Sequence, residues 1–363
     1  MSTVLCIFGT RPEAIKMCPL VLALKSRPAL QTWVLTTGQH GETVREVLSA
    51  FGVFPDVALP ERAGASLSSL FGRLYLEVGE VMERISPSLV LVHGDTATAH
   101  AAALAAFHRR IPVGHVEAGL RTYDMARPFP EESSRRSIAL CASYHFAPTE
   151  GARQNLLREG VSPSSVFVTG NTVVDALKWT VRAEFSHPVL DLGGRLILLT
   201  AHRREHWGEP LAQIFRAVRR VARAVGDVLV ACPVHPNPAV RSLAEGVLAG
   251  EERIRLLPPL GVVEFHNLLA RCHLVLTDSG GIQEEASALG RPTLVLRETT
   301  ERPEGVAAGV LRTVGFGEER VYEEALRLLT DEDAYRAMQN KENPYGDGHA
   351  AERIAEVVLA LQA

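Results

Sequence analysis

The sequence predicts an α/β protein with two doubly wound domains, in which helices cover both faces of a parallel sheet. Short apolar runs alternate with amphipathic stretches along all 363 residues. The runs are continuous rather than alternating in polarity, which indicates strands buried on both faces. The chain is also longer than one hydrophobic core usually supports, which favours two domains.

Continuous apolar runs give the expected strands. In the first half they are residues 4–8, 33–36, 89–92, 113–116, 145–147 and 166–168. In the second half they are residues 196–200, 228–231, 254–257, 274–277 and 293–296. Amphipathic stretches between them, such as 15–25, 98–109 and 211–224, predict helices at a period of 3.6.

The polar stretch 186–194, which contains proline and glycine, is the expected linker. It divides the chain into a first Rossmann-like domain, residues 1–185, and a second one, residues 186–345. The C-terminal helix, 346–363, is expected to return to the first domain. A ligand site is expected in the cleft between the two domains.

Composition excludes several classes of protein. The net charge is −4 and aromatic residues make up 6% of the chain, so the basic stripe with interleaved aromatics of a nucleic-acid binder is missing. No apolar run approaches the roughly 18 residues that a membrane span needs, and the start of the chain does not read as a signal peptide. The 5 scattered cysteines indicate reduced core residues, so a cytoplasmic protein is expected.

Polar residues capable of chemistry stand directly after the expected strands of both domains. Ligands of open parallel sheets bind beyond the carboxyl ends of strands, so these positions predict a binding site. A single such residue is usually only a cap or turn, but several together favour a shared site. They are Arg11, Asp95, Glu117, His202, His235 and Ser279 with Gly280 and Gly281.

The segment 274–289, LVLTDSGGIQEEASAL, is the most informative. Ser279, Gly280 and Gly281 open a helix, whose first turn offers free N–H groups to an anion while glycine allows close approach. Glu285, one turn further on, is placed to accept hydrogen bonds from sugar hydroxyls. The order suits a nucleoside diphosphate, although an ordinary strand-to-helix turn would also carry such glycines.

Carboxylates of the first domain are candidates for proton transfer. Asp95 follows a buried strand, where it could instead cap the next helix. Glu117 has no such role, and a buried glutamate needs a partner. Pro130 marks a helix start that puts Glu131 and Arg135 on one face, either in the site or as an exposed ion pair.

Basic groups complete the candidate site. Arg11 and Lys16 can reach an anion, unless Arg11 merely pairs with Glu13. His202 suits a polyphosphate or leaving group, unless it is an ordinary loop histidine, and Arg302 suits a second phosphate or a uracil edge. No His/Cys set has the spacing of a metal site. The chemistry is therefore expected to need no metal or cofactor, with carboxylates as bases and cations stabilising a leaving group.

The motifs that carry these residues occur in a familiar order. They are GTRPEAIK (9–16), HGDT (93–96), GHVEAGLRT (114–122), PEE (130–132), GNTVVDAL (170–177), AHRRE (201–205), PVHPNP (233–238), TDSGGIQEE (277–285), TTERPEG (299–305) and NPYGDG (343–348). Over essentially its whole length the chain resembles the bacterial non-hydrolysing UDP-N-acetylglucosamine 2-epimerases.

This resemblance implies a glycosyltransferase-B-like fold and the interconversion of UDP-GlcNAc and UDP-ManNAc. The family route eliminates UDP to give 2-acetamidoglucal and then adds UDP back with a proton on the other face. By resemblance, the acid–base residues are Asp95, Glu117 and Glu131, with His202 assisting at the diphosphate. The resemblance assigns substrate and UDP binding to Arg11, Lys16, Arg135, Phe265, Ser279, Gly280, Gly281, Glu285 and Arg302.

The resemblance further implies activation by a second UDP-GlcNAc, at positions matched by Gln39, Glu132 and His235. Residues 39–42 read QHGE, whereas many members have an arginine after the histidine. This departure bears on how tightly an activator binds, not on the chemistry. A homodimer, and ManNAc units for a cell-surface polysaccharide, are implied in the same way.

Three other functions are compatible with parts of the sequence. A glycosyltransferase of the same fold would share the UDP site but would leave the three carboxylates Asp95, Glu117 and Glu131 without a purpose. A hydrolysing epimerase would release ManNAc and UDP. A nucleotide-sugar sensor would need no such carboxylates either.

Overall fold

The computed structural model describes residues 2–61, 66–203, 206–339 and 341–362. The chain forms two units, Met1–Trp179 with Gly346–Ala363, and Thr180–Tyr345. The sequence predicts a division after residue 185, but the structure divides after Trp179. The reason is local: Thr180 and Arg182 already bond to the second unit, through Thr180 Oγ1 to His266 Nδ1 at 2.7 Å and Arg182 N to Asn267 Oδ1 at 2.9 Å.

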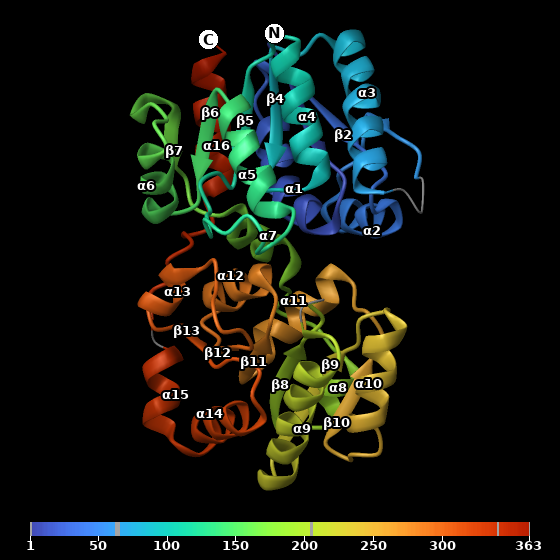
Figure 1. Cartoon of the computed structure of the whole chain (residues 1–363), viewed down its shortest axis with the longest axis vertical. Helices are drawn as coiled ribbons and strands as arrows, with labels where there is room; N and C mark the ends of the chain where they lie inside the picture. Colours follow the sequence, from blue (N-terminus) through green and yellow to red (C-terminus); the bar gives the residue numbers. More distant parts are fainter. Residues whose placement is uncertain (1, 62–65, 204–205, 340, 363) are drawn as a thin grey trace. The chain divides into compact units, whose positions relative to one another are not determined.

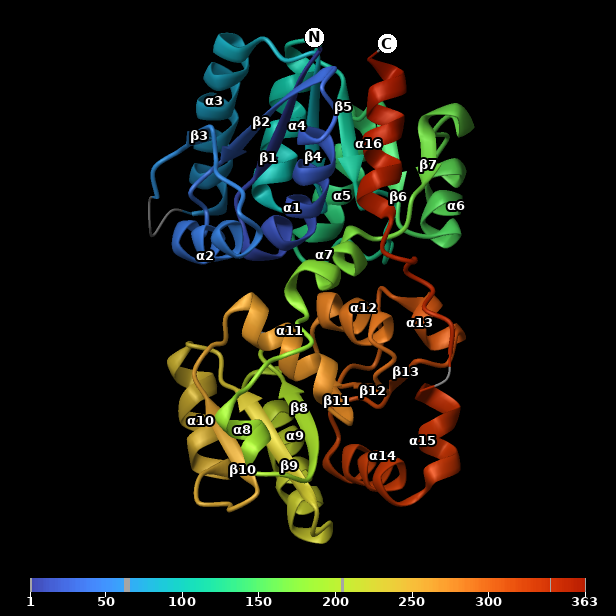
Figure 2. The same cartoon turned by 180° about the vertical axis from the view of Figure 1, so that it is seen from behind.

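The first unit contains a parallel sheet of order β3-β2-β1-β4-β5-β6-β7. Its strands are β1 (Ser2–Phe8), β2 (Leu30–Thr36), β3 (Val57–Ala58), β4 (Leu89–His93), β5 (Val113–Val116), β6 (Tyr144–Ala147) and β7 (Val166–Val168). Its helices are α1 (Arg11–Lys25), α2 (Gly41–Phe51), α3 (Leu67–Ile85), α4 (Ala97–His108), α5 (Glu131–Cys141), α6 (Glu150–Arg158), η1 (Pro163–Ser165), α7 (Thr172–Thr180) and α16 (Ala350–Leu361). Helices α3 and α4 lie on one face of the sheet, and α1 and α16 pack together on the other (Figure 1; Figure 2).

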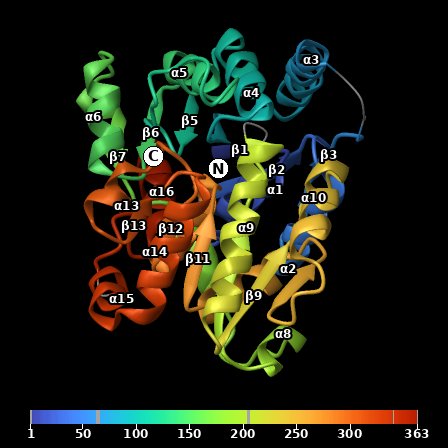
Figure 3. The same cartoon turned by 60° about the horizontal axis from the view of Figure 1, so that its bottom comes forward.

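The second unit contains a parallel sheet of order β10-β9-β8-β11-β12-β13. Its strands are β8 (Arg195–Thr200), β9 (Val228–Pro233), β10 (Ile254–Leu257), β11 (Leu274–Thr277), β12 (Thr293–Val295) and β13 (Leu311–Thr313). Its helices are α8 (Pro188–Asp191), α9 (Glu209–Ala224), α10 (Pro238–Leu248), α11 (Val262–Arg271), α12 (Gly280–Ala288), α13 (Pro303–Ala307), α14 (Glu318–Thr330) and α15 (Glu332–Gln339). Helices α9 and α14 pack together along this unit (Figure 3).

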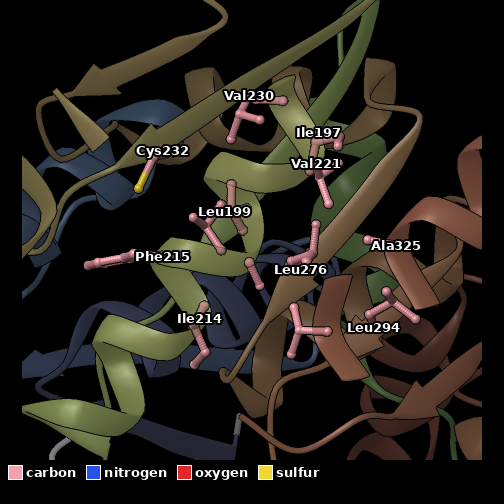
Figure 4. Packing of buried hydrophobic residues seen from close by; sticks show 14 of the residues in the cluster. Ile197, Leu199, Ile214, Phe215, Val221, Val230, Cys232, Leu276, Leu294 and Ala325 are labelled. Carbon is pink, nitrogen blue, oxygen red and sulfur yellow. The ribbon is translucent and has the colours of Figure 1, made fainter. Parts of the chain in front are cut away.

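The core of the second unit shows why its sequence forms these layers. Ile197 and Leu199 on β8 and Val230 on β9 pack against Phe215 and Val221 on α9, and all five are almost fully buried (Figure 4). Alternate residues of the strands face α9, while the residues between them enter a second cluster with α11 and α12. Both faces of the strands are therefore apolar, as continuous hydrophobic strands require.

The order of the strands places a switch point in each sheet. In the first unit the chain turns in opposite directions from β1 and β4, and in the second unit from β8 and β11. Loops that leave the carboxyl ends of such strand pairs form a crevice where ligands bind in doubly wound folds. A ligand site is therefore expected at the residues that follow β1 and β4 in the first unit, and at those that follow β8 and β11 in the second.

Candidate functional site

Glu13 joins the two loops at the switch point of the first unit. Its Oε2 accepts hydrogen bonds from the backbone N–H groups of Gly9 and Thr10, at 3.0 and 2.8 Å. Its Oε1 accepts one from Thr96 Oγ1, at 2.6 Å. Burial raises the pKa of this carboxyl to about 7, against the opposing effect of these hydrogen bonds. Glu13 thus fixes the start of α1 relative to the loop that carries Asp95.

A second cluster surrounds Glu117, which follows β5 and has a φ of 65°, a conformation that a residue with a side chain rarely adopts. Lys16 Nζ on α1 donates a hydrogen bond to Glu117 Oε2. Asn171 Nδ2 donates to the same oxygen at 2.9 Å, and His93 Nε2 lies 3.7 Å from it. Lys16, expected to bind substrate, thus forms an ion pair with the carboxylate expected to transfer protons.

Asp95 pairs with Arg135, whose Nε and Nη2 lie 2.8 and 2.7 Å from Asp95 Oδ2. Asp95 is not the cap of α4, because Thr96 holds that position and its side chain accepts from Ala99 N. Arg135 is 5% exposed. The alternative in which Glu131 and Arg135 form an exposed ion pair is therefore wrong. Arg135 is buried, and it binds Asp95 in the loop after β4.

Glu132 lies beneath Arg135 and is completely buried. Its carboxylate accepts the N–H groups of Thr122 and Tyr123, at 3.0 and 3.1 Å, and pairs with Arg135 Nη1 at 3.2 Å. These bonds hold the loop between β5 and α5. Glu131, the neighbouring candidate, begins α5 as the Pro130 signal predicted, and its Oε2 is buried.

The two remaining candidates of the first unit lie nearby. Arg11 is the first residue of α1 and is partly buried. Gln39 Oε1 accepts a hydrogen bond from Thr98 Oγ1 on α4, at 2.9 Å. A Cβ on Gly9 would lie 3.3 Å from Gln39 Cβ, so the glutamine packs against the turn after β1.

In the second unit, Asp278 organises the loop that carries His202. Its Oδ2 accepts the backbone N–H groups of His202 and Arg203, both at 2.9 Å, and lies 3.2 Å from His206 Nδ1. Burial opposes the charge of Asp278, but the hydrogen bond from His206 and the charge of His202 hold the pKa of Asp278 below its usual value. The last two residues of the AHRRE motif, 204–205, lie outside the described residues.

His202 and His235 stack on each other, with ring centroids 5.2 Å apart and 8° between the planes. The backbone N–H of Asn237 donates to His235 Nδ1 at 3.1 Å. Burial and then the nearby charge of His202 lower the pKa of His235. A charge on His202 therefore disfavours protonation of the stacked His235 ring.

Helix α12 begins at Gly280, with Ser279 at the N-cap position. A Cβ on Gly280 would lie 2.7 Å from Glu301 Oε1, whereas one on Gly281 would meet nothing within 4 Å. The first turn of α12 is therefore open beside Gly281, as an anion site requires.

Arg302 is buried beside that turn and is held by Glu284 Oε1 and Glu301 Oε1, each at 2.9 Å. Burial opposes the charge of Glu301, but the charges of Arg302, Arg297 and Arg203 depress its pKa strongly. Glu285 lies further along α12, with Oε2 3.6 Å from His266 Nε2. Phe265, next to that histidine on α11, is partly buried.

Sequence reasoning missed Glu13, His93, Asn171 and Asp278, which hold the candidate residues in place. Asp278 directly follows β11, and Asn171 lies in the turn after β7. The rule that selected Asp95 and Glu117 could therefore have selected them too. Glu13 gave a weaker signal, because an acidic residue in the first turn of a helix is common.

Within the described ranges, no group of three or more His, Cys, Asp or Glu residues could hold a metal ion. None of the described helices is both long and apolar enough to cross a membrane.

Comparison with known proteins places this geometry in context. A family model described as UDP-N-acetylglucosamine 2-epimerase matches residues 22–359. The UDP-N-acetylglucosamine 2-epimerase of Bacillus subtilis is 51% identical over 359 residues, 98% of this chain and 94% of that protein.

Solved structures agree. A co-structure of S. aureus MnaA with UDP has a TM-score of 0.96 and 46% identity, covering 100% of this chain and 97% of that one. The UDP-GlcNAc 2-epimerase from Neisseria meningitidis, bound to UDP-GlcNAc, has a TM-score of 0.93 and 40% identity, covering 99% and 100%. These matches confirm the α/β fold class predicted from the sequence, and the chain belongs to the UDP-N-acetylglucosamine 2-epimerase family.

Proposed function

We propose that this protein interconverts UDP-GlcNAc and UDP-ManNAc without hydrolysing them, by eliminating UDP and adding it back. The proton on C2 is not acidic, because no carbonyl group adjoins that carbon. Removal of the proton must therefore accompany departure of the leaving group. The electrons of the C2–H bond form the C1=C2 double bond, while UDP leaves with the electrons of the C1–O bond.

One observation carries this proposal. Two carboxylates, Asp95 and Glu117, follow the adjacent strands β4 and β5, and each is paired with a partly or fully buried cation. Inversion needs a group that removes a proton from one face of C2 and a group that delivers a proton to the other. A glycosyltransferase or a binding protein has no use for such a pair. In the proposal, Asp95, Glu117 and Glu131 share these tasks, each typically worth about 10²–10⁴-fold in rate.

The second unit supplies the groups for UDP. The open turn beside Gly281 suits the diphosphate, because helix N-termini attract anions. His202 assists departure of the diphosphate, and Arg302 and Ser279 bind it, with Arg11, Lys16 and Arg135 as further substrate contacts. Phe265 lies by the uracil and Glu285 accepts from the ribose. The glucal must be protected from water until UDP returns.

The proposal extends to regulation and setting. A second UDP-GlcNAc activates the enzyme through Gln39, Glu132 and His235. Since the Glu132 carboxylate already binds two backbone N–H groups and Arg135, it acts there by shaping the loop after β5. The enzyme is a cytoplasmic homodimer that needs no metal or cofactor, and it supplies ManNAc units for a cell-surface polysaccharide.

NMR of the protein with UDP-GlcNAc in D₂O tests the reaction. Deuterium at C2 together with UDP-ManNAc supports the proposal. Free ManNAc and UDP would instead mean a hydrolysing enzyme. A substrate that stays unchanged and undeuterated would mean a glycosyltransferase or a sensor.

A further inference from the structure

Asn171 lies in the turn after β7 and is 2% exposed. Its Nδ2 donates to Glu117 Oε2 at 2.9 Å, the oxygen that also accepts from Lys16. This asparagine, which follows the edge strand β7, therefore contacts the carboxylate that follows β5, two strands away. The local structure of its own turn does not explain this contact.

The orientation of the amide follows from its other contact. Asn171 Oδ1 accepts the backbone N–H of Val173 at 3.0 Å, at the start of α7. A backbone N–H can only donate, so the oxygen of the amide must face Val173 and the nitrogen must face Glu117. An amide nitrogen in turn can only donate. The Asn171–Glu117 bond therefore forms only with an accepting oxygen on Glu117.

Two titratable groups face Glu117 from neighbouring elements, Lys16 on α1 and His93 on β4. Both favour the ionised carboxylate when charged, and Asn171 favours it at any pH. These three groups all lie on the side of Glu117 Oε2 and hold the carboxylate in one orientation. Oε1 lies 3.6 Å from where a Cβ of Gly94 would stand, beside the turn that carries Asp95.

We propose that Asn171 is a positioning residue that fixes Glu117 in one orientation and favours its ionised form. The inference rests on the proposed epimerisation, in which Glu117 is an acid–base group. Asn171 does not touch the substrate. It acts by holding Oε2 of Glu117 as an acceptor and by favouring the carboxylate over the protonated form.

Two substitutions separate this role from a structural one. Asn171→Asp keeps an acceptor for Val173 but turns a second carboxylate oxygen toward Glu117, so that one of the pair retains a proton. Asn171→Ser keeps a favoured helix-capping residue but is too short to reach Glu117. Ser66→Asp is the control, because Ser66 caps α3 in the same unit and the change adds the same charge.

The measurement is the dependence of kcat on pH, with KM. For Asn171→Asp we expect the acidic limb to move to higher pH by about one unit or more, and kcat at neutral pH to fall about tenfold or more. KM should stay within about twofold. Asn171→Ser should lower kcat with a smaller displacement of the limb, and Ser66→Asp should resemble the wild type. If both Asn171 variants keep the wild-type limb, whether active or equally impaired, the inference is wrong.

A second readout does not depend on turnover. The ¹³C resonance of the Glu117 carboxyl, assigned by its loss in Glu117→Gln, should remain that of a carboxylate between about pH 5 and pH 8 in the wild type, whereas in Asn171→Asp one carboxyl of the new pair should titrate in this range. A wild-type protein that epimerises no sugar nucleotide would refute the proposed function. An Asn171→Asp protein in which neither carboxyl of the new pair titrates in this range would refute the role of Asn171.

Discussion

The imidazole rings of His202 and His235 lie parallel in the second unit, 5.2 Å apart, so the charge on one ring depends on the charge on the other. Asn237 donates its backbone N–H to His235 Nδ1, which keeps that nitrogen unprotonated. The stack therefore couples protonation of His235 to the charge of His202. It also joins the residue proposed for catalysis to one proposed for activation.

Replacing His202 by Asn should therefore raise the pKa of His235. Burial would still hold that pKa below the ordinary value, but the repulsion from His202 would be gone. Titration of the imidazole resonances by NMR in both proteins measures the change. An unchanged His235 titration would mean that the stacked rings are not electrostatically coupled.

Asp95→Asn and Glu117→Gln should each abolish turnover, because a neutral amide can neither accept nor deliver the C2 proton. UDP affinity, measured by calorimetry, should stay within about tenfold of the wild type, since UDP is assigned to other residues. Retained activity in both variants would remove these residues from the mechanism.

The two glycines of α12 offer a matched pair of substitutions. Gly281→Ala meets open space, so it should stabilise the helix by about 0.5–1 kcal/mol while weakening UDP binding, because the methyl group occupies the path of the phosphate. Gly280→Ala forces Glu301 and Arg302 to shift and should lower both stability and UDP affinity. Thermal unfolding with and without UDP distinguishes the two. Unweakened UDP binding in Gly281→Ala would place the diphosphate elsewhere.

Glu13 should make stability depend on pH. Its pKa is raised to about 7 in the folded protein from an ordinary value of 4.5, so the folded state holds a proton that the unfolded state has lost between those values. The free energy of unfolding should accordingly fall as pH rises from about 4.5 to 7, by about 1.4 kcal/mol per pH unit and so about 3 kcal/mol at most. Denaturant unfolding of wild type and Glu13→Gln at several pH values tests this. The glutamine variant should lack this component, and parallel curves would contradict the assignment.

Asp278→Asn should destabilise the second unit and weaken UDP binding. The amide oxygen can still accept the N–H groups of His202 and Arg203, but the amide nitrogen would replace the buried Oδ1 without an acceptor, and the negative charge beside His206 would be lost, at a cost of about 1–3 kcal/mol. Asp227→Asn is the control, because its bonds to Arg195 lie at the surface and should matter far less. Similar effects of the two substitutions on UDP affinity would show that Asp278 does not position the loop.

Much of the fold could be predicted because buried parallel strands leave continuous apolar runs. All the expected strands are confirmed. The strand β3 was missed because Val57–Ala58 has only 2 residues, and β13 because Leu311–Thr313 has Arg312 at its centre and is not an apolar run. The domain boundary was placed late, since the bonds of Thr180 to α11 link residues far apart in sequence.

The site was predictable as a set of positions but not as a network. Strand ends identified Asp95 and Glu117, yet nothing local to these residues indicated that Arg135 and Lys16 would be their partners. Such pairings depend on how α1 and α5 pack on the sheet. The roles of the site residues remain predictions, to be decided by the substitutions above.

The second unit is one uninterrupted stretch, whereas the first is completed only by α16, whose N-terminus is held by Asp175 through the N–H groups of Ala350 and Ala351. On the ribosome, the sheet of the first unit must therefore wait until α16 has been translated before the face of α1 that α16 covers is shielded. The second unit is complete before α16 is made and can fold first, and a nascent chain that stalls before α16 would expose an unfinished apolar surface to chaperones.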